Sequence, residues 1–519
     1  MRTIEMQWRT PAFLALSFVY LFLTLFLASG TPIFFENDHF LQMYDSVRML
    51  NGELLYKDFF QFTFPGTEVW YLILFSIFGQ KLWLLNATIV LLGLSLTWTI
   101  LAMSRRLMDG VYVYIAPTLF LFFGFRWFGM DGGHRLFSCL FASLAILVLL
   151  DKVNWKRLVG AGILAAMSAF FTQTRGLAVL AGIGIFLIWY YATQNSNHRL
   201  KRILVSSITV GMAFSLSLIG LLSYFLMTVG VSNFLESTIL FGQSYASDPV
   251  NNSNLYFLFW KELFRGHFDI VSLPVNLFYY LLVPAVYAVP LIYYLVKRPA
   301  NQEVWFKIML LCSAGLMMFL ATTGLNSVRL YHVAIPGLVL ISFWWSTLRL
   351  RSVFLAGTCV AALFAVAICV WGQLKHYPVR LEMPTGAAVF QSEPAAEKYR
   401  WLVDNTAPGD VVFESYRTVV NFPLKLQNPT SVPMLRNTNY TSPTQISQVI
   451  AELQQNPPKY ILWDGVWSEK STPRAIDDNL QPMFEFLTAN YQRVEKLATV
   501  HGIEIEIWER KEGEEIELN

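Results

Sequence analysis

The sequence predicts an α-helical polytopic membrane protein with about eleven transmembrane helices and a small C-terminal α/β soluble domain. Of its 519 residues, 55% are hydrophobic and only 14% are charged, whereas soluble domains carry about 25% charged residues. Uncharged apolar segments long enough to cross about 30 Å of hydrocarbon recur through the N-terminal part. The composition becomes polar after Trp371. We therefore expect a transmembrane domain at 1–375 and a soluble domain at 376–519.

The predicted crossings are eleven apolar segments separated by polar connections. They lie at 11–33, 82–103, 111–125, 136–150, 158–173, 176–193, 203–229, 271–296, 308–325, 333–346 and 352–373. The first follows Arg2 and Arg9 and lacks a small-residue cleavage site, so we expect an uncleaved anchor. Residues 67–80 are too few to span and include Glu68, which favours a juxtamembrane or re-entrant helix.

The charges of the connections predict the orientation. One alternating set holds 15 Lys and Arg in about fifty residues, and the other holds nine in about 110 residues with most of the acids. Basic connections stay in the cytoplasm, which places the basic N-terminal segment inside. Eleven crossings, an odd number, then place the C-terminal domain outside. One miscounted helix would reverse that side. The outer loops 34–81 and 230–270 are long and aromatic. Because loops held by a scaffold carry function, we expect a site on the extracytoplasmic face of the inner (plasma) membrane.

Several functional classes are disfavoured by the composition and motifs. The basic residues form no stripe with aromatic residues, which argues against nucleic acid. The sequence contains no P-loop and no GxGxxG that opens a helix after a strand. Nucleotide donors are scarce outside the cell, so an enzyme there needs a pre-activated, membrane-borne substrate. The four cysteines (Cys139, Cys312, Cys359 and Cys369) lie in apolar runs without a CxxC pair and are expected to be buried.

The C-terminal domain is predicted from local periodicity. The segments AAEKYRWLVDNT and QISQVIAELQQN favour helices, and DVVFESY and YILWDGV favour strands. The segments YQRVEKLATV and IEIEIWER alternate like a terminal hairpin. No nucleophile–base grouping is visible there, so we expect this domain to recruit an acceptor or to face the cell wall.

The first outer loop, 34–81, has the most informative pattern. Asp38, Gln42, Asp45 and Met49 are spaced three or four apart, as on one face of a short surface helix that Gly52 ends. The loop contains ENDHF, MLNGELLYKDF, FPG and FSIFGQ in this order. In this order of motifs it resembles the first outer loop of the GT-C superfamily of polytopic glycosyltransferases. Its members include protein O-mannosyltransferases and the transferase that adds aminoarabinose to lipid A. Phe64-Pro65 stands where the aminoarabinose branch has Pro-Pro, which argues against that acceptor.

The resemblance implies roles for the loop acids. In the superfamily this loop carries a DxD, ExD or DE pair, here Glu36 and Asp38 in ENDHF. Asp38 is therefore the candidate base or acceptor-positioning carboxylate, and Glu36 would assist it or hold a cation. A solvated acidic loop is the alternative for both residues.

A second candidate group lies in the predicted outer turn FRWFGMDGGHRLF. Superfamily members often place another acid in this turn, here Asp131. If the turn is helical, Asp131 and His134 would share a face and could bind a metal together with Asp38 or Glu36. A divalent metal ion is thus a candidate cofactor, although a hard cation needs several oxygen ligands. The alternative is an interfacial capping turn.

Four cations are candidates for binding the donor phosphate. Arg175 lies between two apolar runs, where an unpaired guanidinium is costly. The planar guanidinium suits phosphate oxygens. A snorkelling arginine at a helix end is the alternative. Arg329, in GLNSVRLYHVAIPG, is similar in position to superfamily residues that contact the carrier phosphate, and His332 beside it is a candidate metal or acceptor contact. Arg135 and Lys57 complete the set, with a hydrated loop lysine as the alternative for Lys57.

The expected function is therefore that of a membrane glycosyltransferase, hexosyl- or pentosyl-transferring. It would move a sugar with inversion from a polyprenyl-phosphate carrier to a lipid, glycan or protein acceptor. A transporter or flippase of lipid-linked or amphiphilic substrates is the main alternative, although the spans hold few ionisable residues and no clear inverted repeat. A polymerase or ligase of lipid-linked glycans and a noncatalytic scaffold also stay open.

Overall fold

The computed structural model describes residues 2–194, 198–247, 272–297, 301–323, 327–375, 377, 379–436, 441–465, 480–498 and 504–511. The chain divides into two compact units. Unit 1 consists of residues 1–24, 87–224 and 252–370, and unit 2 consists of 25–86, 225–251 and 371–519. The first outer loop thus belongs to the same unit as the residues that follow Trp371.

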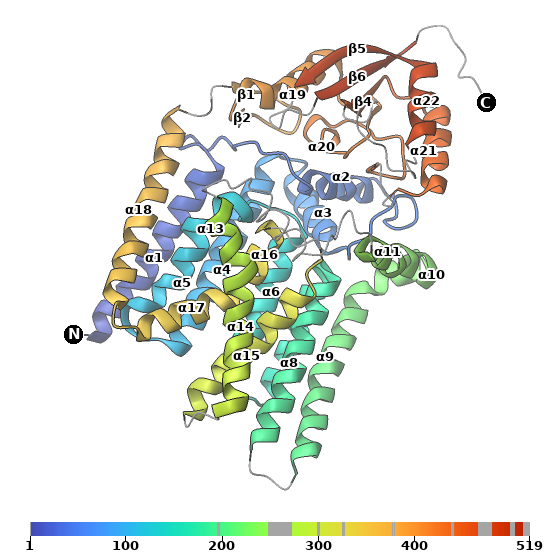
Figure 1. Ribbon diagram of the computed structural model, residues 1–519. Helices are drawn as coiled ribbons and strands as arrows, with labels where there is room; N and C mark the ends of the chain where they lie inside the picture. Colours follow the sequence, from blue (N-terminus) through green and yellow to red (C-terminus); the bar gives the residue numbers. More distant parts are fainter. Residues whose placement is uncertain are drawn as a thin grey trace. The chain divides into compact units, whose positions relative to one another are not determined.

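Helices occupy all eleven positions that the sequence predicts as crossings (Figure 1). They are α1 (Arg2–Leu25), α4 (Trp83–Leu107), the run η1 (Gly110–Tyr114), α5 (Ile115–Thr118) and η2 (Leu119–Gly129), α6 (His134–Leu149), α7 (Trp155–Phe171), α8 (Gln173–Thr193), α9 (Arg199–Thr228), the run α13 (Ser272–Leu277), η4 (Phe278–Leu282) and α14 (Val283–Lys297), α15 (Gln302–Leu320), the pair α16 (Ser327–Val333) and α17 (Ile335–Thr347), and α18 (Arg351–Lys375).

Among the described residues, eight of these helices are long and apolar enough to cross a membrane. A ninth span results if α16 and α17, which are bent by 66° at their junction, count as one. The remaining two, α6 and α7, have 16 and 17 residues and are at the short end for a span. The polytopic helical class that the sequence predicts is confirmed.

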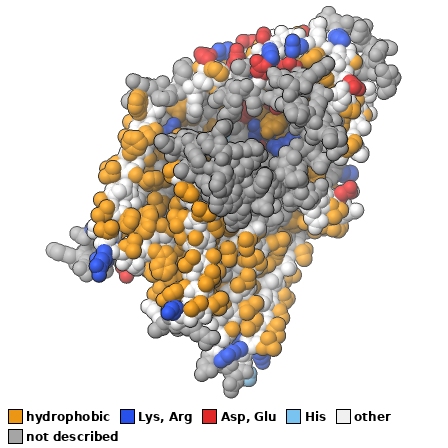
Figure 2. Space-filling model, in the orientation of Figure 1, with side chains coloured by type: hydrophobic (Ala, Val, Ile, Leu, Met, Phe, Trp, Pro, Cys, Tyr) orange, Lys and Arg blue, Asp and Glu red, His pale blue; other side chains and the backbone are white. Residues whose placement is uncertain are grey.

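The outer faces of several helices are apolar and exposed, as lipid contact requires. In the apolar 18-residue stretch of α9 only 17% is buried, and in that of α18 only 11% is buried. Met227 on α9 and Leu363 on α18 are among the exposed side chains, and Figure 2 shows hydrophobic side chains over much of the helical part in view. Exposed apolar surface of this extent marks a membrane-facing protein. Three of the four cysteines are buried, as predicted. Cys359 is exposed instead, because it lies on α18, whose surface is largely exposed.

Three of the basic connections lie together in unit 1. Asp151 accepts hydrogen bonds from Arg106 at 2.8 Å and from Arg157 at 2.9 Å. The ammonium of Lys307 donates to the backbone carbonyl of Arg106 at 2.8 Å. Connections that the charge pattern assigns to one side of the membrane therefore meet at one end of the helices.

Unit 1 is held by close packing between helices. α15 packs against α8 and α14 (Figure 1). α7 packs against α6 and α8. The ring of Tyr287 on α14 lies directly over Gly315, where a Cβ would clash with it. Its hydroxyl donates to the carbonyl of Val333 at 2.8 Å and accepts from the amide of Gly337 at 2.9 Å. These bonds satisfy backbone groups at the bend between α16 and α17.

Unit 2 contains the remaining elements. They are α2 (His39–Leu50), α3 (Gly66–Phe78), α10 (Val231–Leu235), η3 (Glu236–Leu240), α11 (Phe241–Ser247), β1 (Val379–Leu381), β2 (Ala388–Phe390), α19 (Glu393–Asn405), β3 (Val412–Glu414), α20 (Asn421–Leu424), α21 (Pro443–Gln455), β4 (Tyr460–Asp464), α22 (Gln481–Asn490), β5 (Tyr491–Ala498) and β6 (Glu504–Arg510).

The larger sheet has the strand order β3-β4-β6-β5. β3 and β4 are parallel, whereas β6 is antiparallel to both β4 and β5. Strands β1 and β2 form a separate antiparallel pair. The helices, the strands and the terminal hairpin predicted for this region are all present. α3 is a 13-residue apolar helix, as expected for the segment too short to span.

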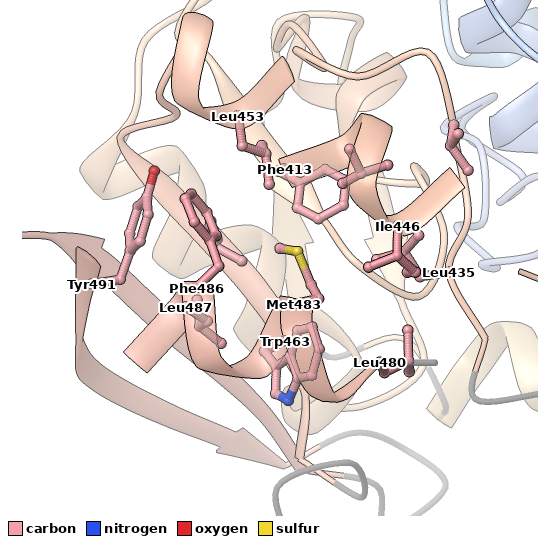
Figure 3. Packing of buried hydrophobic residues seen from close by; sticks show 13 residues of the cluster. Phe413, Leu435, Ile446, Leu453, Trp463, Leu480, Met483, Phe486, Leu487 and Tyr491 are labelled. Carbon is pink, nitrogen blue, oxygen red and sulfur yellow. The ribbon is translucent and has the colours of Figure 1, made fainter. Parts of the chain in front are cut away.

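The sheet has its own hydrophobic core (Figure 3). Trp463 of β4 and Phe413 of β3 pack against Leu453 of α21 and Met483 of α22, and all four are buried. Ser442 begins α21 with a capping box, in which its side chain and that of Gln445 bond each other's backbone amides. The predicted α/β character of the C-terminal region is therefore confirmed.

The first loop is joined to this region by backbone and side-chain bonds. The amide of Phe34 donates to the carbonyl of Val389 in β2 at 2.8 Å, and the rings of Phe34 and Phe390 stack at 4.5 Å. From α2, Arg48 donates to the carbonyl of Thr430 at 2.9 Å. These contacts explain why the two segments form one compact unit.

Candidate functional site

Asp38 stands at the start of the loop helix α2. It occupies the N-cap position, but its side chain makes no capping hydrogen bond. Instead, its Oδ1 accepts a hydrogen bond from Nη1 of Arg417 at 2.8 Å. The side chain of Asp38 is 45% exposed, so this ion pair lies at the surface of unit 2. α2 ends near Gly52, whose φ of +97° stops the helix where the sequence predicts.

Glu36, the other acid of the pair, lies in a network of charged groups. Its Oε2 accepts from the hydroxyl of Tyr399 at 2.6 Å and lies 2.8 Å from Nζ of Lys398. The same ammonium lies 3.0 Å from Oε1 of Glu414. Desolvation opposes the ionisation of Glu36, but the Lys398 ammonium and the Tyr399 hydroxyl hold the pKa of Glu36 below its usual value. Glu36 is therefore a stable carboxylate.

Lys398 and Glu414 are themselves buried. Burial raises the pKa of Glu414 despite the neighbouring ammonium. Burial disfavours the charged form of Lys398, yet the two carboxylates raise the pKa of Lys398 above its usual value. The sequence did not single out Lys398, Tyr399, Glu414 or Arg417, because they lie more than 360 residues from Glu36 and no spacing connects them to it.

Asp131 and Arg135 form an ion pair in unit 1. η2, a π-helical segment of the kind often found at functional sites, leads into the turn that contains Asp131. One oxygen of Asp131 accepts from the amide of Gly133 at 2.8 Å, and the other accepts from Nη1 of Arg135 at 2.7 Å. Asp131 is only 2% exposed. The bond to Gly133, the N-cap of α6, forms a local Asx-type turn directly before this helix.

Arg175 is buried against the same turn. Its Nη1 donates to the carbonyl of Arg135 and to Oγ of Ser138, both at 2.7 Å. Beside it, a ring nitrogen of His134 is hydrogen-bonded to the hydroxyl of Thr172 at 2.8 Å. Arg175 is thus not a snorkelling helix-end residue, since its guanidinium is directed into protein.

Arg329 completes a local excess of positive charge. It lies close enough to Arg175 to interact electrostatically, as do Asp131 and Arg135. Nη1 of Arg329 donates to the carbonyl of Thr323 at 2.5 Å. The cluster therefore holds three guanidinium groups and one carboxylate, a balance that suits a phosphate group.

His332 presents a buried acceptor to this cluster. Its Nδ1 lies 2.6 Å from the carbonyl of Val328. A carbonyl only accepts, so Nδ1 carries a proton, and in the neutral ring Nε2 keeps a lone pair. Nε2 is buried without a hydrogen-bond partner among the described residues. The neighbouring Tyr331 fixes α16 by donating to the carbonyl of Phe120 at 2.9 Å.

The structure therefore brings six of the predicted residues together in unit 1: Asp131, His134, Arg135, Arg175, Arg329 and His332. Glu36 and Asp38 lie in the network of unit 2. Lys57 is exposed, and no hydrogen bond or ion pair of its ammonium is found within the described part of the loop.

The carboxylates do not fit a metal site as they stand. Both oxygens of Asp131 are taken by N–H donors, and Glu36 faces an ammonium and a hydroxyl. Among the described residues, no group of three or more His, Cys, Asp or Glu is arranged to hold a metal ion. Since hard cations need several oxygen ligands, we derive no step through a metal.

Comparisons with known proteins place the fold. No protein-family model and no curated protein matches the sequence. The structure is similar to that of ArnT from Cupriavidus metallidurans bound to undecaprenyl phosphate, with a TM-score of 0.60 and 10% identity over 96% of this chain and 97% of that one. It is also similar to archaeal oligosaccharyltransferase AglB from Archaeoglobus fulgidus in complex with an inhibitory peptide and a dolichol-phosphate. The TM-score is 0.54, with 11% identity over 98% of this chain and 74% of that one. The chain therefore has the fold that these two proteins share, as the resemblance of its first loop and its helix pattern lead us to expect.

Proposed function

We propose that this protein is a glycosyltransferase that moves a sugar from a polyprenyl-phosphate carrier to a hydroxyl of a lipid, glycan or protein acceptor on the extracytoplasmic face of the membrane. Two observations support the proposal. The fold extends over 97% of an ArnT chain that binds undecaprenyl phosphate, and the loop acid expected at the corresponding place, Asp38, is a partly exposed and charge-paired carboxylate.

The proposed reaction is a single displacement. The acceptor oxygen forms a bond to C1 of the sugar while the bond between C1 and the phosphate oxygen breaks, and the electron pair of that bond leaves with the polyprenyl phosphate. The acceptor proton moves to the carboxylate of Asp38. Attack opposite to the leaving group inverts the configuration at C1.

The leaving phosphate requires positive charge. Within unit 1, Arg175 and Arg329 are the proposed phosphate-binding residues, because guanidinium groups form charge-assisted hydrogen bonds with phosphate oxygens. Arg135 is less suited to direct contact, since Asp131 already neutralises it. In the neutral imidazole of His332, Nε2 is suited to accept a hydrogen bond from a hydroxyl of a molecule bound in unit 1.

The function is tested by mass spectrometry of envelope glycans and lipids from cells with and without the gene. The proposal predicts that one sugar modification disappears in the deletion strain and that the matching polyprenyl-phosphate sugar accumulates. An unchanged set of glycans and lipid-linked sugars would contradict it. Loss of the lipid-linked sugar from the outer leaflet alone would favour a flippase.

A further inference from the structure

The carboxylate of Asp38 is oriented by a residue of the C-terminal region. Arg417 reaches it over 379 residues of sequence with a charge-assisted hydrogen bond of 2.8 Å. The loop helix supplies no such restraint, because the side chain of Asp38 makes no capping bond.

Arg417 is itself held in place. Its guanidinium carbon lies 4.9 Å from the ring centre of Tyr416, a distance typical of a cation–π contact. Arg436 approaches the same ring at 5.6 Å, and its Nη2 is 3.4 Å from the Tyr416 hydroxyl. Burial disfavours the charged form of Arg417, but Asp38 outweighs it and keeps the pKa of Arg417 above its usual value. The guanidinium therefore stays charged over the whole working pH range.

The second loop acid is restrained by the same region. Lys398 and Tyr399 of α19 both contact Glu36. Both acids of the ENDHF turn are thus fixed by side chains from residues 398–417. An accessory domain that only recruits an acceptor would not need these contacts.

We propose that Arg417 is a positioning residue for Asp38, and that the C-terminal region is thereby a working part of the active site. This inference rests on the proposed function, since it assumes that Asp38 removes the acceptor proton. It assigns to the C-terminal region a role in the chemical step, where the sequence alone predicts acceptor recruitment or wall contact.

The test compares three full-length variants, Arg417→Gln, Arg417→Lys and the control Arg400→Gln. Arg400 pairs with Glu393 at the surface, where both side chains are largely exposed and such pairs contribute little. Transfer is measured with the undecaprenyl-phosphate sugar that the envelope comparison identifies. We expect Arg417→Gln to lower kcat by about 10- to 100-fold with the KM for the donor unchanged. Arg417→Lys should recover part of this loss because it keeps the charge, and Arg400→Gln should behave like the wild type.

A double variant separates positioning from direct substrate contact. If Arg417 acts through Asp38, Arg417→Gln combined with Asp38→Asn should be no slower than Asp38→Asn alone. A wild-type kcat in Arg417→Gln would overturn the inference, as would a raised donor KM with kcat unchanged. Multiplying effects in the double variant would overturn it as well.

Amide hydrogen exchange distinguishes failure of the inference from failure of the proposed function. If the wild-type protein transfers no sugar, the function is wrong, but the restraint is still measurable. Exchange in the peptide at 36–42 should then be faster in Arg417→Gln than in Arg400→Gln. Equal exchange in the two variants would show that Arg417 does not order the turn and would overturn the inference by itself.

Discussion

Nζ of Lys398 lies 2.8 Å from the carboxylate of Glu36, and the two residues come from opposite ends of the chain. The Lys398 side chain is only 8% exposed and also contacts Glu414. One buried cation therefore pairs with two carboxyl groups. Such a group is costly to remove, because the remaining charges have no partner in a region of low dielectric.

We predict that Lys398→Met destabilises unit 2. It leaves Glu36 and Glu414 facing each other, and breaking a buried ion pair costs about 3–5 kcal/mol. The unfolding midpoint of the detergent-solubilised protein, followed by tryptophan fluorescence, should fall by several degrees. Lys496→Met is the control, since Lys496 pairs with Glu504 at the surface. Equal midpoints for the two variants would show that the network does not stabilise the fold.

Asp45 and Glu68 form a second buried acidic pair in the first loop. Nε2 of Gln61 lies 3.2 Å from Oδ2 of Asp45 and 3.4 Å from Oε1 of Glu68. Burial raises the pKa of Asp45 to about 7, although Arg48 partly offsets it. Burial and the neighbouring Asp45 also raise the pKa of Glu68.

This pair predicts a pH dependence. A carboxyl whose pKa is higher in the folded chain binds its proton more tightly there, so stability falls as the pH rises from about 4 to about 7. Asp45→Asn removes this penalty, and we expect it to stabilise the protein by roughly 2–4 kcal/mol at pH 8 and hardly at all at pH 4. The measurement is the difference in unfolding midpoint between variant and wild type at both pH values. A difference that does not change with pH would contradict the prediction.

Arg175 should dominate phosphate binding in unit 1. We expect Arg175→Gln to weaken binding of undecaprenyl phosphate at least about tenfold, because it removes a charge-assisted interaction. Native mass spectrometry of the purified protein measures this, with undecaprenol as the phosphate-free comparison and Arg157→Gln as the control variant. Arg157 pairs with Asp151 among the basic connections. Unchanged affinity in a folded Arg175→Gln protein would assign the phosphate to other residues.

The orientation is tested by cysteine labelling. Asn51 is exposed at the end of α2, and Cys359 is the exposed native cysteine. We expect Asn51→Cys in a Cys359→Ala background to react with a membrane-impermeant maleimide in right-side-out vesicles and not in sealed inside-out vesicles. The opposite result would place the first loop in the cytosol.

Local patterns predicted most elements, because apolar runs and period-two alternation reflect the burial of neighbouring residues. The helix after Asp38, the short α3 and the terminal hairpin β5–β6 all follow from such patterns. Contacts between distant segments did not follow. The pairing of Arg417 with Asp38 depends on how β3 and the loop fold together, and one sequence contains no signal for that. The 66° bend between α16 and α17 was also missed, although Pro336 near the start of α17 is a local signal for a helix boundary.

The catalytic role of Asp38 is tested most directly by sugar transfer in Asp38→Asn. Asn is a good N-cap residue, so the variant should fold, and Asp404→Asn, which alters an exposed carboxylate on α19, controls for the loss of one charge. The account predicts that Asp38→Asn lowers transfer from the undecaprenyl-phosphate donor by about 10²- to 10⁴-fold, while Asp404→Asn keeps the wild-type rate. Transfer by folded Asp38→Asn at the wild-type rate would contradict it.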